Sequence, residues 1–127
     1  MRRALLAAAL ACCVSPAVPA HAADDYVDCA HAITQFDMNI CADKDYYKSD
    51  GKLNAVYKTL RAALDDGGRL KLRDAQRAWI QFRDQECRLE SAQNEGGTIY
   101  PMVYAGCVTA LTDARTRQLE QLLKEVR

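Results

Sequence analysis

The stretch from Gln76 to Cys87 constrains the fold more than any other part of the chain. At about 100° per residue, Gln76, Arg83 and Cys87 fall on one stripe of a helix, with Trp79 beside it. An amphipathic helix normally places aliphatic side chains on that stripe, so a glutamine and an arginine there indicate a polar core. A cysteine near the helix end indicates a covalent bond to another element. The combination is typical of a small stapled domain rather than of a catalytic centre.

The first residues are typical of an export signal. Met1-Arg2-Arg3 is a short basic start, the apolar run 4–14 is too short to span a bilayer, and Ala20-His21-Ala22 fits a signal-peptidase site. We therefore predict a signal peptide over residues 1–22 and one mature domain over residues 23–127, which is periplasmic or secreted. The alternative is lipidation at Cys12, which residues 9–12 suggest by resembling a lipobox. No other segment is long and apolar enough to be transmembrane.

Four cysteines remain once residues 1–22 are removed: Cys29, Cys41, Cys87 and Cys107. An even number in an oxidising compartment indicates disulfides. Of the three possible pairings we favour Cys29–Cys41 and Cys87–Cys107, because each pair can lie across a short local reversal of the chain. The sequence has no CxxC pair and only His31 as a mature histidine, so we expect no metal site and no other cofactor.

The charge balance argues against nucleic acid as a partner. Loss of Arg2 and Arg3 from the 17 basic residues leaves 15 against 17 acidic residues, a net charge of −2. Binding to nucleic acid would call for a basic patch. The mature chain is one domain in length, and it is small enough that two disulfides would stabilise it materially.

Hydrophobic periodicity predicts helices in the first half of the mature chain. One helix is expected from Thr34, where Thr34-x-x-Asp37 resembles a capping box, to about Ala42. A polar connection over residues 43–49 leads to Asp50 as the N-cap of a second helix. That helix is expected to stop at Gly67-Gly68, in a left-handed cap. Its apolar stripe is Leu53, Val56, Tyr57, Leu60 and Leu64.

The second half of the chain predicts two further helices. The third helix is expected from about Arg69 to Ala92, and a break over residues 94–98 follows it. The fourth is expected from Tyr100-Pro101 to near the C-terminus, with proline in its first turn. No β-alternating run of useful length occurs. The predicted fold is therefore all-α, a small four-helix bundle-like domain stapled by two disulfides.

Arg115 interrupts the apolar stripe of the fourth helix as Arg83 interrupts that of the third. A buried guanidinium without a partner is severely destabilising. We predict that each arginine pairs with a carboxylate or backbone carbonyls, or reaches solvent past an apolar stem, so that Gln76, Trp79, Arg83 and Arg115 form a structural polar core. The candidate acids are Asp84, Glu86, Asp37, Asp50 and Asp113. The alternative is an anion-binding pocket made by the two arginines.

Three motifs together resemble those of the LprI-like family. They are Asp50-x-x-Leu53-Asn54-x-x-Tyr57, Gln76-Arg77-x-Trp79-x-x-x-Arg83-Asp84-x-x-Cys87 and Cys107-x-x-x-Leu111-Thr112-x-x-Arg115-x-x-x-Leu119. The family consists of small exported bacterial proteins named after a mycobacterial lysozyme inhibitor. The resemblance covers nearly the whole mature chain and implies an α-helical, cysteine-stapled envelope domain. It also implies lysozyme inhibition as a function to test.

No residue combination indicates catalysis. A Ser/His/Asp or Cys/His arrangement would have to recruit His31, which lies beside Cys29 in the N-terminal segment. The paired carboxylates Asp24-Asp25 and Asp65-Asp66 fit solvation and helix termination better than acid–base chemistry. We therefore predict that the protein is not an enzyme and has no catalytic residue.

Binding to a protein partner is the function that remains. The leading hypothesis is an inhibitor of lysozyme or another cell-wall hydrolase, which would push a loop into a cleft lined by two carboxylates. Residues 95–101 and 45–48 are the candidate loops, because tyrosines are favoured interface anchors and a lysine could meet a carboxylate. The partner-binding residues expected there are Tyr46, Tyr47, Lys48, Glu95, Thr98 and Tyr100. The alternatives are that these are ordinary loops, and that the protein is a structural or assembly module of the cell envelope with no inhibitory activity.

Overall fold

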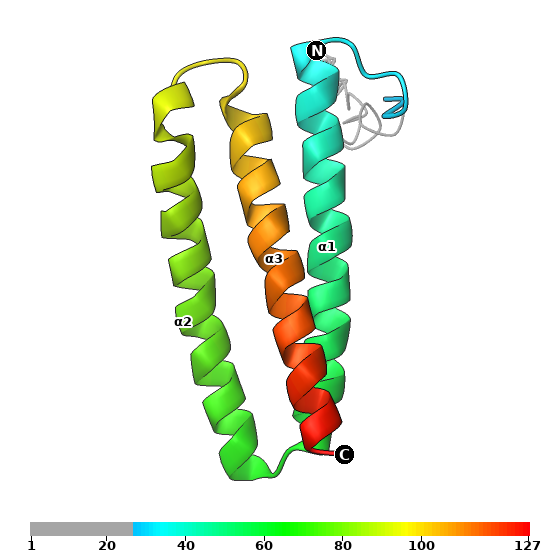
Figure 1. Cartoon of the computed structure of the whole chain (residues 1–127), viewed down its shortest axis with the longest axis vertical. Helices are drawn as coiled ribbons and strands as arrows, with labels where there is room; N and C mark the ends of the chain where they lie inside the picture. The colour runs from blue at the N-terminus through cyan, green and yellow to red at the C-terminus, as the bar shows by residue number, and fades with distance from the viewer. Residues whose placement is uncertain (1–26) are drawn as a thin grey trace, which may run out of the picture.

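The computed structural model describes residues 27–127, which form three long helices. They are α1 (Gln35–Ala63), α2 (Asp66–Ser91) and α3 (Tyr100–Glu125), and one turn of 3-10 helix, η3 (Ala92–Asn94), follows α2. Figure 1 shows α1 and α3 running in one direction and α2 in the other. Residues 27–127 contain no strand, so the all-α prediction is confirmed. The predicted signal peptide and the alternative anchor at Cys12 lie outside the described residues.

The helix count differs from the expected four because the first two predicted helices are one. Residues 43–49, predicted as a connection, lie within α1, and Asp50 is an interior residue that accepts a hydrogen bond from Asn54 Nδ2 at 2.8 Å. Neither glycine nor proline interrupts residues 43–49, so nothing in the backbone ends the helix there. The polar residues of this segment are the solvent face of a helix whose buried side includes Ser49 and Leu53. The start of α1 is as predicted, since the Thr34 side chain accepts from the Asp37 amide.

The Gly67-Gly68 pair begins α2 instead of ending the helix before it. α1 ends at Ala63, and Asp65 caps α2 by accepting a hydrogen bond from the Gly68 amide at 2.7 Å. In residues 27–127 only Gly96 has a positive φ, so no left-handed cap forms at Gly67-Gly68. A Cβ on Gly68 would lie 3.2 Å from the Leu64 side chain. The glycine thus permits a close approach in the turn between α1 and α2.

The break before α3 lies where it was predicted. Gly96 has a φ of 79°, which favours glycine, and it falls between η3 and α3. α3 begins at Tyr100 with Pro101 in its first turn, a position that needs no amide hydrogen. The last two predicted helices are therefore present, close to the expected bounds.

The core lies between α3 and its two neighbours. α3 packs most extensively against α1 and less against α2, while α1 and α2 make few contacts with each other. In Figure 1, α3 accordingly lies between the other two helices. A cluster near the α1–α2 turn consists of Leu53, Leu60, Leu72 and Leu119. A second cluster, nearer the α2–α3 loop, consists of Cys87, Cys107 and Val108. The sparse contact between α1 and α2 leaves room for pockets on that side of the bundle.

Both predicted disulfides are present. Cys87–Cys107 joins α2 to α3 with both sulfurs in the core, and Cys29–Cys41 ties the N-terminal segment to α1. In the loop-entropy model, loops of 12 and 20 residues correspond to stabilisation of about 3 kcal/mol each. The first bond holds the N-terminal segment, and the second holds α2 to α3 near the loop that joins them.

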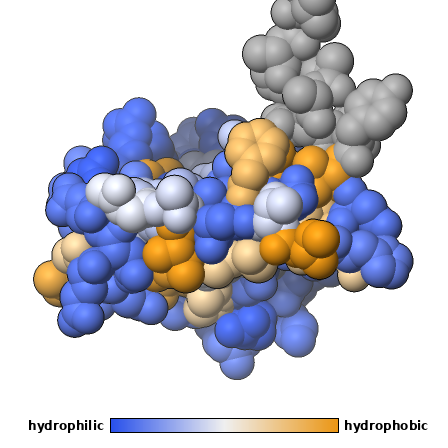
Figure 2. All heavy atoms as spheres, turned by 90° about the horizontal axis from the view of Figure 1, so that it is seen from above, coloured by the Kyte–Doolittle hydropathy of each residue, from blue (hydrophilic) through white to orange (hydrophobic). Residues whose placement is uncertain are grey.

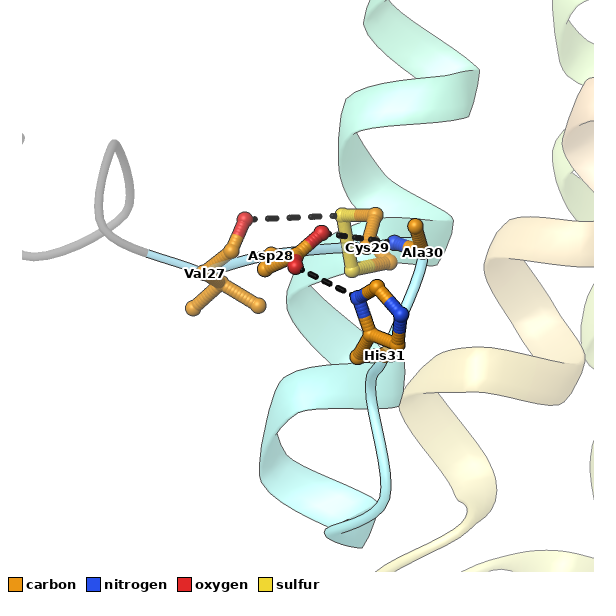
Figure 3. A network of polar contacts seen from close by, with 6 residues as sticks. Val27, Asp28, Cys29, Ala30 and His31 are labelled. Atoms are coloured by element: carbon orange, nitrogen blue, oxygen red, sulfur yellow. Dashed lines mark hydrogen bonds and ion pairs between the residues drawn. A yellow bond between two sulfur atoms is a disulfide. The ribbon is translucent and has the colours of Figure 1, made fainter.

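The N-terminal segment also carries a small polar network. His31 Nδ1 lies 2.7 Å from Asp28 Oδ2, and the Ala30 amide donates to Asp28 Oδ1 at 3.0 Å (Figure 3). The hydrogen bond from His31, followed by that from Ala30, lowers the pKa of Asp28. His31 is exposed, and its neighbour Cys29 is held in a disulfide. The pair stabilises a turn at the surface.

Candidate binding site between the helices

Arg83 is the buried centre of the polar core. Its Nε and Nη2 atoms lie 2.9 and 2.8 Å from Asp84 Oδ1, and only 8% of the residue is exposed. The guanidinium lies over the rings of Trp79 and Tyr46, at 5.3 and 5.6 Å from their centroids. Burial lowers the pKa of Arg83, but the hydrogen bond to Asp84 and the charge interactions with Tyr46 and Asp84 outweigh burial, so the pKa is raised. Arg83 is thus a charged residue that the fold holds in place.

Arg115 reaches the same tryptophan from α3. Its Nε donates to Gln76 Oε1 at 3.1 Å and its Nη1 to Gln118 Oε1 at 3.2 Å, and the guanidinium lies 5.9 Å from the Trp79 centroid. These partners are neutral, and burial lowers the pKa of Arg115. Of the acids suggested by the sequence, Asp84 pairs with Arg83, whereas Asp113 accepts from Ser49 Oγ. Gln76, Trp79 and the two arginines therefore meet, and both guanidinium groups have internal partners, which counts against an anion receptor.

The segment 45–48 is helical, so the predicted loop there was wrong. Tyr46 and Tyr47 turn toward α2 and α3, and their ring centroids are 5.6 Å apart. Lys48, two residues beyond Tyr46, lies on a different side of α1, in a pocket with Ser49 and Asp113. A helix rotates about 200° over two residues, which is why these side chains do not act together.

In the segment 95–101, residues 95–99 form the connection before α3 and are held against α1, and residues 100–101 begin α3. Asn39 Nδ2 donates to the Thr98 carbonyl at 3.0 Å, and Glu95 is exposed. Tyr100 stacks on Tyr104, with centroids 6.1 Å apart and an interplanar angle of 19°. The connection is therefore attached to α1 through Thr98, and the stacking of Tyr100 on Tyr104 is a contact within α3.

Tyr46 and Tyr47 of α1 and Tyr104 of α3 line one cavity, which we call the tyrosine pocket. It has a volume of about 230 Å³ and is lined by residues of all three helices. Its lining consists of Asp43, Tyr46, Tyr47, Arg83, Asp84, Tyr104, Ala105 and Val108. Ala105 and Val108 are buried, whereas Tyr47 is 71% exposed. Tyr104 was not among the site residues predicted from the sequence, although its i,i+4 spacing from Tyr100 could have indicated it.

A second cavity, the tryptophan pocket, lies between α1 and α2. Its volume is about 250 Å³ and it shares Tyr46 and Arg83 with the tyrosine pocket. The remaining lining residues are Asp50, Leu53, Asn54, Tyr57, Gln76, Trp79 and Ile80. The contact between Arg83 and Tyr46 thus lies between the two pockets, which follow one another along the sparsely packed side of the bundle.

Apolar side chains are exposed at the end of the bundle that carries the α2–α3 loop. Ile33 is 87%, Phe36 69% and Ile99 38% exposed. Figure 2 views this end and shows apolar atoms among hydrophilic ones. Among residues 27–127, no helix combines the length and the apolarity that crossing a membrane requires. Nor does that part of the chain gather three or more His, Cys, Asp or Glu side chains that could hold a metal ion.

A model of the family described as "Lysozyme inhibitor LprI" matches residues 28–119. The chain belongs to the LprI family. The match includes α1, α2 and most of α3, and with them both pockets and all four cysteines of the disulfides. The resemblance that the three motifs indicated is confirmed.

Two relatives and one solved structure are also similar to the chain. The chain is 38% identical to the "Uncharacterized protein R02472" of Rhizobium meliloti strain 1021, over 91% of this chain and 90% of that protein. It is 28% identical to the "Uncharacterized protein YecT" of Escherichia coli K12, over 66% of this chain and 63% of that one. The crystal structure of a DUF1311 family protein from Pseudomonas putida KT2440 superposes with a TM-score of 0.65 at 22% identity, covering 69% of this chain and 92% of that one. The last comparison supports the fold alone.

Proposed function

We propose that the protein is an exported binding protein of the cell envelope that inhibits lysozyme or another cell-wall hydrolase. Residues 1–22 would direct export, and residues 23–127 would act in the periplasm or outside the cell. The two disulfides support export, since such bonds form and persist in oxidising compartments. The match to a family described as a lysozyme inhibitor supports the kind of target.

The tyrosine pocket is the observation that carries the proposal of a protein partner. Hot spots at protein interfaces are enriched in tyrosine, and they lie in pockets that exclude water. Tyr47 offers a largely exposed ring at the pocket, and Tyr46 and Tyr104 are half-buried beside it. Phe36 and Ile99 expose further apolar area toward the α2–α3 loop. A partner that covers this half of the bundle would bury aromatic area around a preformed cavity.

A binding mode that uses the bundle surface replaces the long loop expected from the sequence. The connection before α3 is short and bonded to α1 through Thr98, so it cannot extend far from the helices. The residues most suited to contact a hydrolase are instead Tyr46, Tyr47 and Tyr100 on helices, with Glu95 and Thr98 at the rim. Lys48 lies on another side of α1 and does not belong to this surface.

A lysozyme turbidity assay tests the proposal directly. The full chain is expressed with its own leader, and the oxidised exported protein is added to lysozyme and a suspension of cell walls. We expect slower clearing with the wild-type protein. Tyr47→Ala should weaken inhibition about 30-fold, the loss of about 2 kcal/mol that is typical of a tyrosine hot spot.

Phe82→Ala is the matched control for this assay. Phe82 is also an exposed aromatic residue, at 54%, and it lines neither the tyrosine pocket nor the tryptophan pocket. Its substitution should leave inhibition unchanged. No slowing at a large molar excess of the wild-type protein would remove lysozyme as the target. Recovery of an endogenous envelope protein by pull-down from periplasmic extract, without inhibition, would instead support an assembly module.

A further inference from the structure

We propose that the tyrosine pocket binds the cationic side chain of a lysine or arginine presented by the partner protein. The inference rests on the proposed function only in taking the occupant to be part of a protein. It assigns the chemistry of the contact, and it applies to any partner that offers such a side chain.

The shape of the pocket suits one long side chain. Buried Ala105 and Val108 give it an apolar floor, and the rings of Tyr46, Tyr47 and Tyr104 line it. The methylene stem of a lysine or arginine packs on apolar surface while its head stays near polar groups. A volume of about 230 Å³ admits a side chain of this length but not a folded segment.

The charges of the lining favour a cation. The lining includes the carboxylates of Asp43 and Asp84 as well as the guanidinium of Arg83. Both bonds from Arg83 to Asp84 end on Oδ1, so Arg83 leaves Oδ2 of this carboxylate to other donors. About 34% of the Asp84 side chain is exposed, which makes it accessible from the pocket. A charge-assisted hydrogen bond to Oδ2 would hold the incoming head group.

The aromatic rings of the pocket also attract cations. Ring faces attract cations, and tyrosine and tryptophan do so best when the site is partly desolvated. The fold already uses this contact, because Arg83 rests over the rings of Tyr46 and Trp79. Tyr47 and Tyr104 present further rings at the pocket.

Asp84 also acts on the third tyrosine of the pocket, Tyr104. Burial and the charge of Asp84 raise the pKa of the Tyr104 hydroxyl, although Arg88 and Arg83 act in the opposite direction. Asp84 is the strongest charge acting on this group. A cation that enters beside Tyr104 would therefore lie in the field of the Asp84 carboxylate.

Titration with single amino-acid probes, followed by NMR, tests the inference apart from any hydrolase. The oxidised exported protein is titrated with Nα-acetyl-L-lysine methylamide and with the norleucine analogue, which has a similar stem without the charge. We expect the lysine probe to shift the resonances of Tyr46, Tyr47 and Tyr104, and to bind about fivefold more tightly than the norleucine probe.

Asp84→Asn and Asp74→Asn form a matched pair of variants. Asp74 accepts from Arg73 as Asp84 accepts from Arg83, on the same helix, but it lies outside the pocket. Asp84→Asn keeps an oxygen that can accept from Arg83, and it should weaken the binding of the lysine probe about fivefold. Asp74→Asn should leave the binding of this probe unchanged. Tyr47→Ala, which removes a largely exposed ring and leaves the core intact, should also weaken the probe.

The outcomes separate the inference from the proposed function. Equal binding of the lysine and norleucine probes, no shift of the pocket tyrosines, or equal effects of Asp84→Asn and Asp74→Asn would each overturn the cationic occupant. Asp84-dependent binding of lysine in a protein that does not inhibit lysozyme would support the inference and reject that target.

Discussion

The replacement of Arg83 by alanine tests whether the polar core stabilises the protein. Loss of one partner from a fully buried ion pair costs about 3–5 kcal/mol. About a third of the Asp84 side chain is exposed and can be rehydrated, so we place the free-energy cost of losing the pair at about 3 kcal/mol or less. Loss of the contacts with Tyr46 and Trp79 adds roughly 0.5–1 kcal/mol each. We therefore expect Arg83→Ala to lower the free energy of unfolding by about 3 kcal/mol.

The neighbouring Arg73–Asp74 pair provides the control. Its sequence arrangement and its hydrogen bond repeat those of Arg83–Asp84, but its side chains are 45% and 63% exposed. Exposed pairs of this kind contribute about 0–1 kcal/mol, so Arg73→Ala should change the free energy of unfolding by less than about 0.5 kcal/mol. The difference between the two variants measures burial and ring contacts rather than the pair itself.

Urea unfolding of the oxidised proteins measures both changes. Trp79 fluorescence reports the polar core and far-ultraviolet circular dichroism reports the helices, and coincident transitions would support two-state unfolding. A loss of about 3 kcal/mol should lower Tm by roughly 10 °C in a domain of this size. If Arg83→Ala and Arg73→Ala have the same stability, or if Arg83→Ala loses less than about 1 kcal/mol, the assignment of a stabilising role to the buried arginine is wrong.

Three further perturbations follow from the disulfides, the cap of α1 and the N-terminal turn. Replacement of both Cys87 and Cys107 by alanine should lower the free energy of unfolding by about 3 kcal/mol in a urea titration, and an unchanged midpoint would contradict the loop-entropy estimate. Thr34→Ala removes the acceptor for the first turn of α1 and should cost about 1 kcal/mol in thermal unfolding, whereas Thr34→Ser should restore most of it. His31→Ala should raise the pKa of Asp28 toward its ordinary value, as followed by NMR of the carboxyl carbon. A carboxyl whose pKa is lowered in the folded state stabilises the protein at pH values above its ordinary pKa, and this stabilisation is lost as the pH falls through the folded-state pKa. An unaltered titration of Asp28 in His31→Ala would show that the hydrogen bond from His31 does not cause the lowered pKa.

The helices could be predicted where apolar spacing and caps agreed, and the errors lie where a polar run had two physical explanations. Residues 43–49 are polar enough for a connection, but they also fit the solvent face of a long helix whose inward side chains are Tyr46 and Ser49. Gly67-Gly68 fits a helix end as well as a helix start, and the decisive residue was Asp65, which accepts from the Gly68 amide. For residues 43–49, local sequence does not distinguish the two explanations because helical propensity is a weak guide that tertiary packing overrides.

The residues of the polar core could be predicted from the sequence, but the hydrogen bonds between them could not. The stripe that contains Gln76, Trp79 and Arg83 follows from helical spacing, and Arg115 could be identified by the same rule on the fourth predicted helix. That Arg115 bonds to glutamines rather than to an acid depends on the offset between α2 and α3, which periodicity does not contain. The convergence of Tyr46 and Tyr104 on one pocket depends likewise on how three helices are set beside each other.

The attachment of α2 has a consequence for when the protein can act. This helix makes few contacts with α1, and it is held by the tight turn at Asp65 and by the Cys87–Cys107 bond near its other end. Arg83 and Asp84, which form the α2 wall of the tyrosine pocket, lie within four residues of that bond. Before oxidation, α2 is attached to α3 by side-chain packing and by the hydrogen bond from Arg115 to Gln76, which lies farther along α2 from this wall. We therefore expect the reduced chain to bind poorly and the oxidised chain to bind well. If the protein is exported as proposed, its binding activity would begin only in the oxidising compartment where the bond forms.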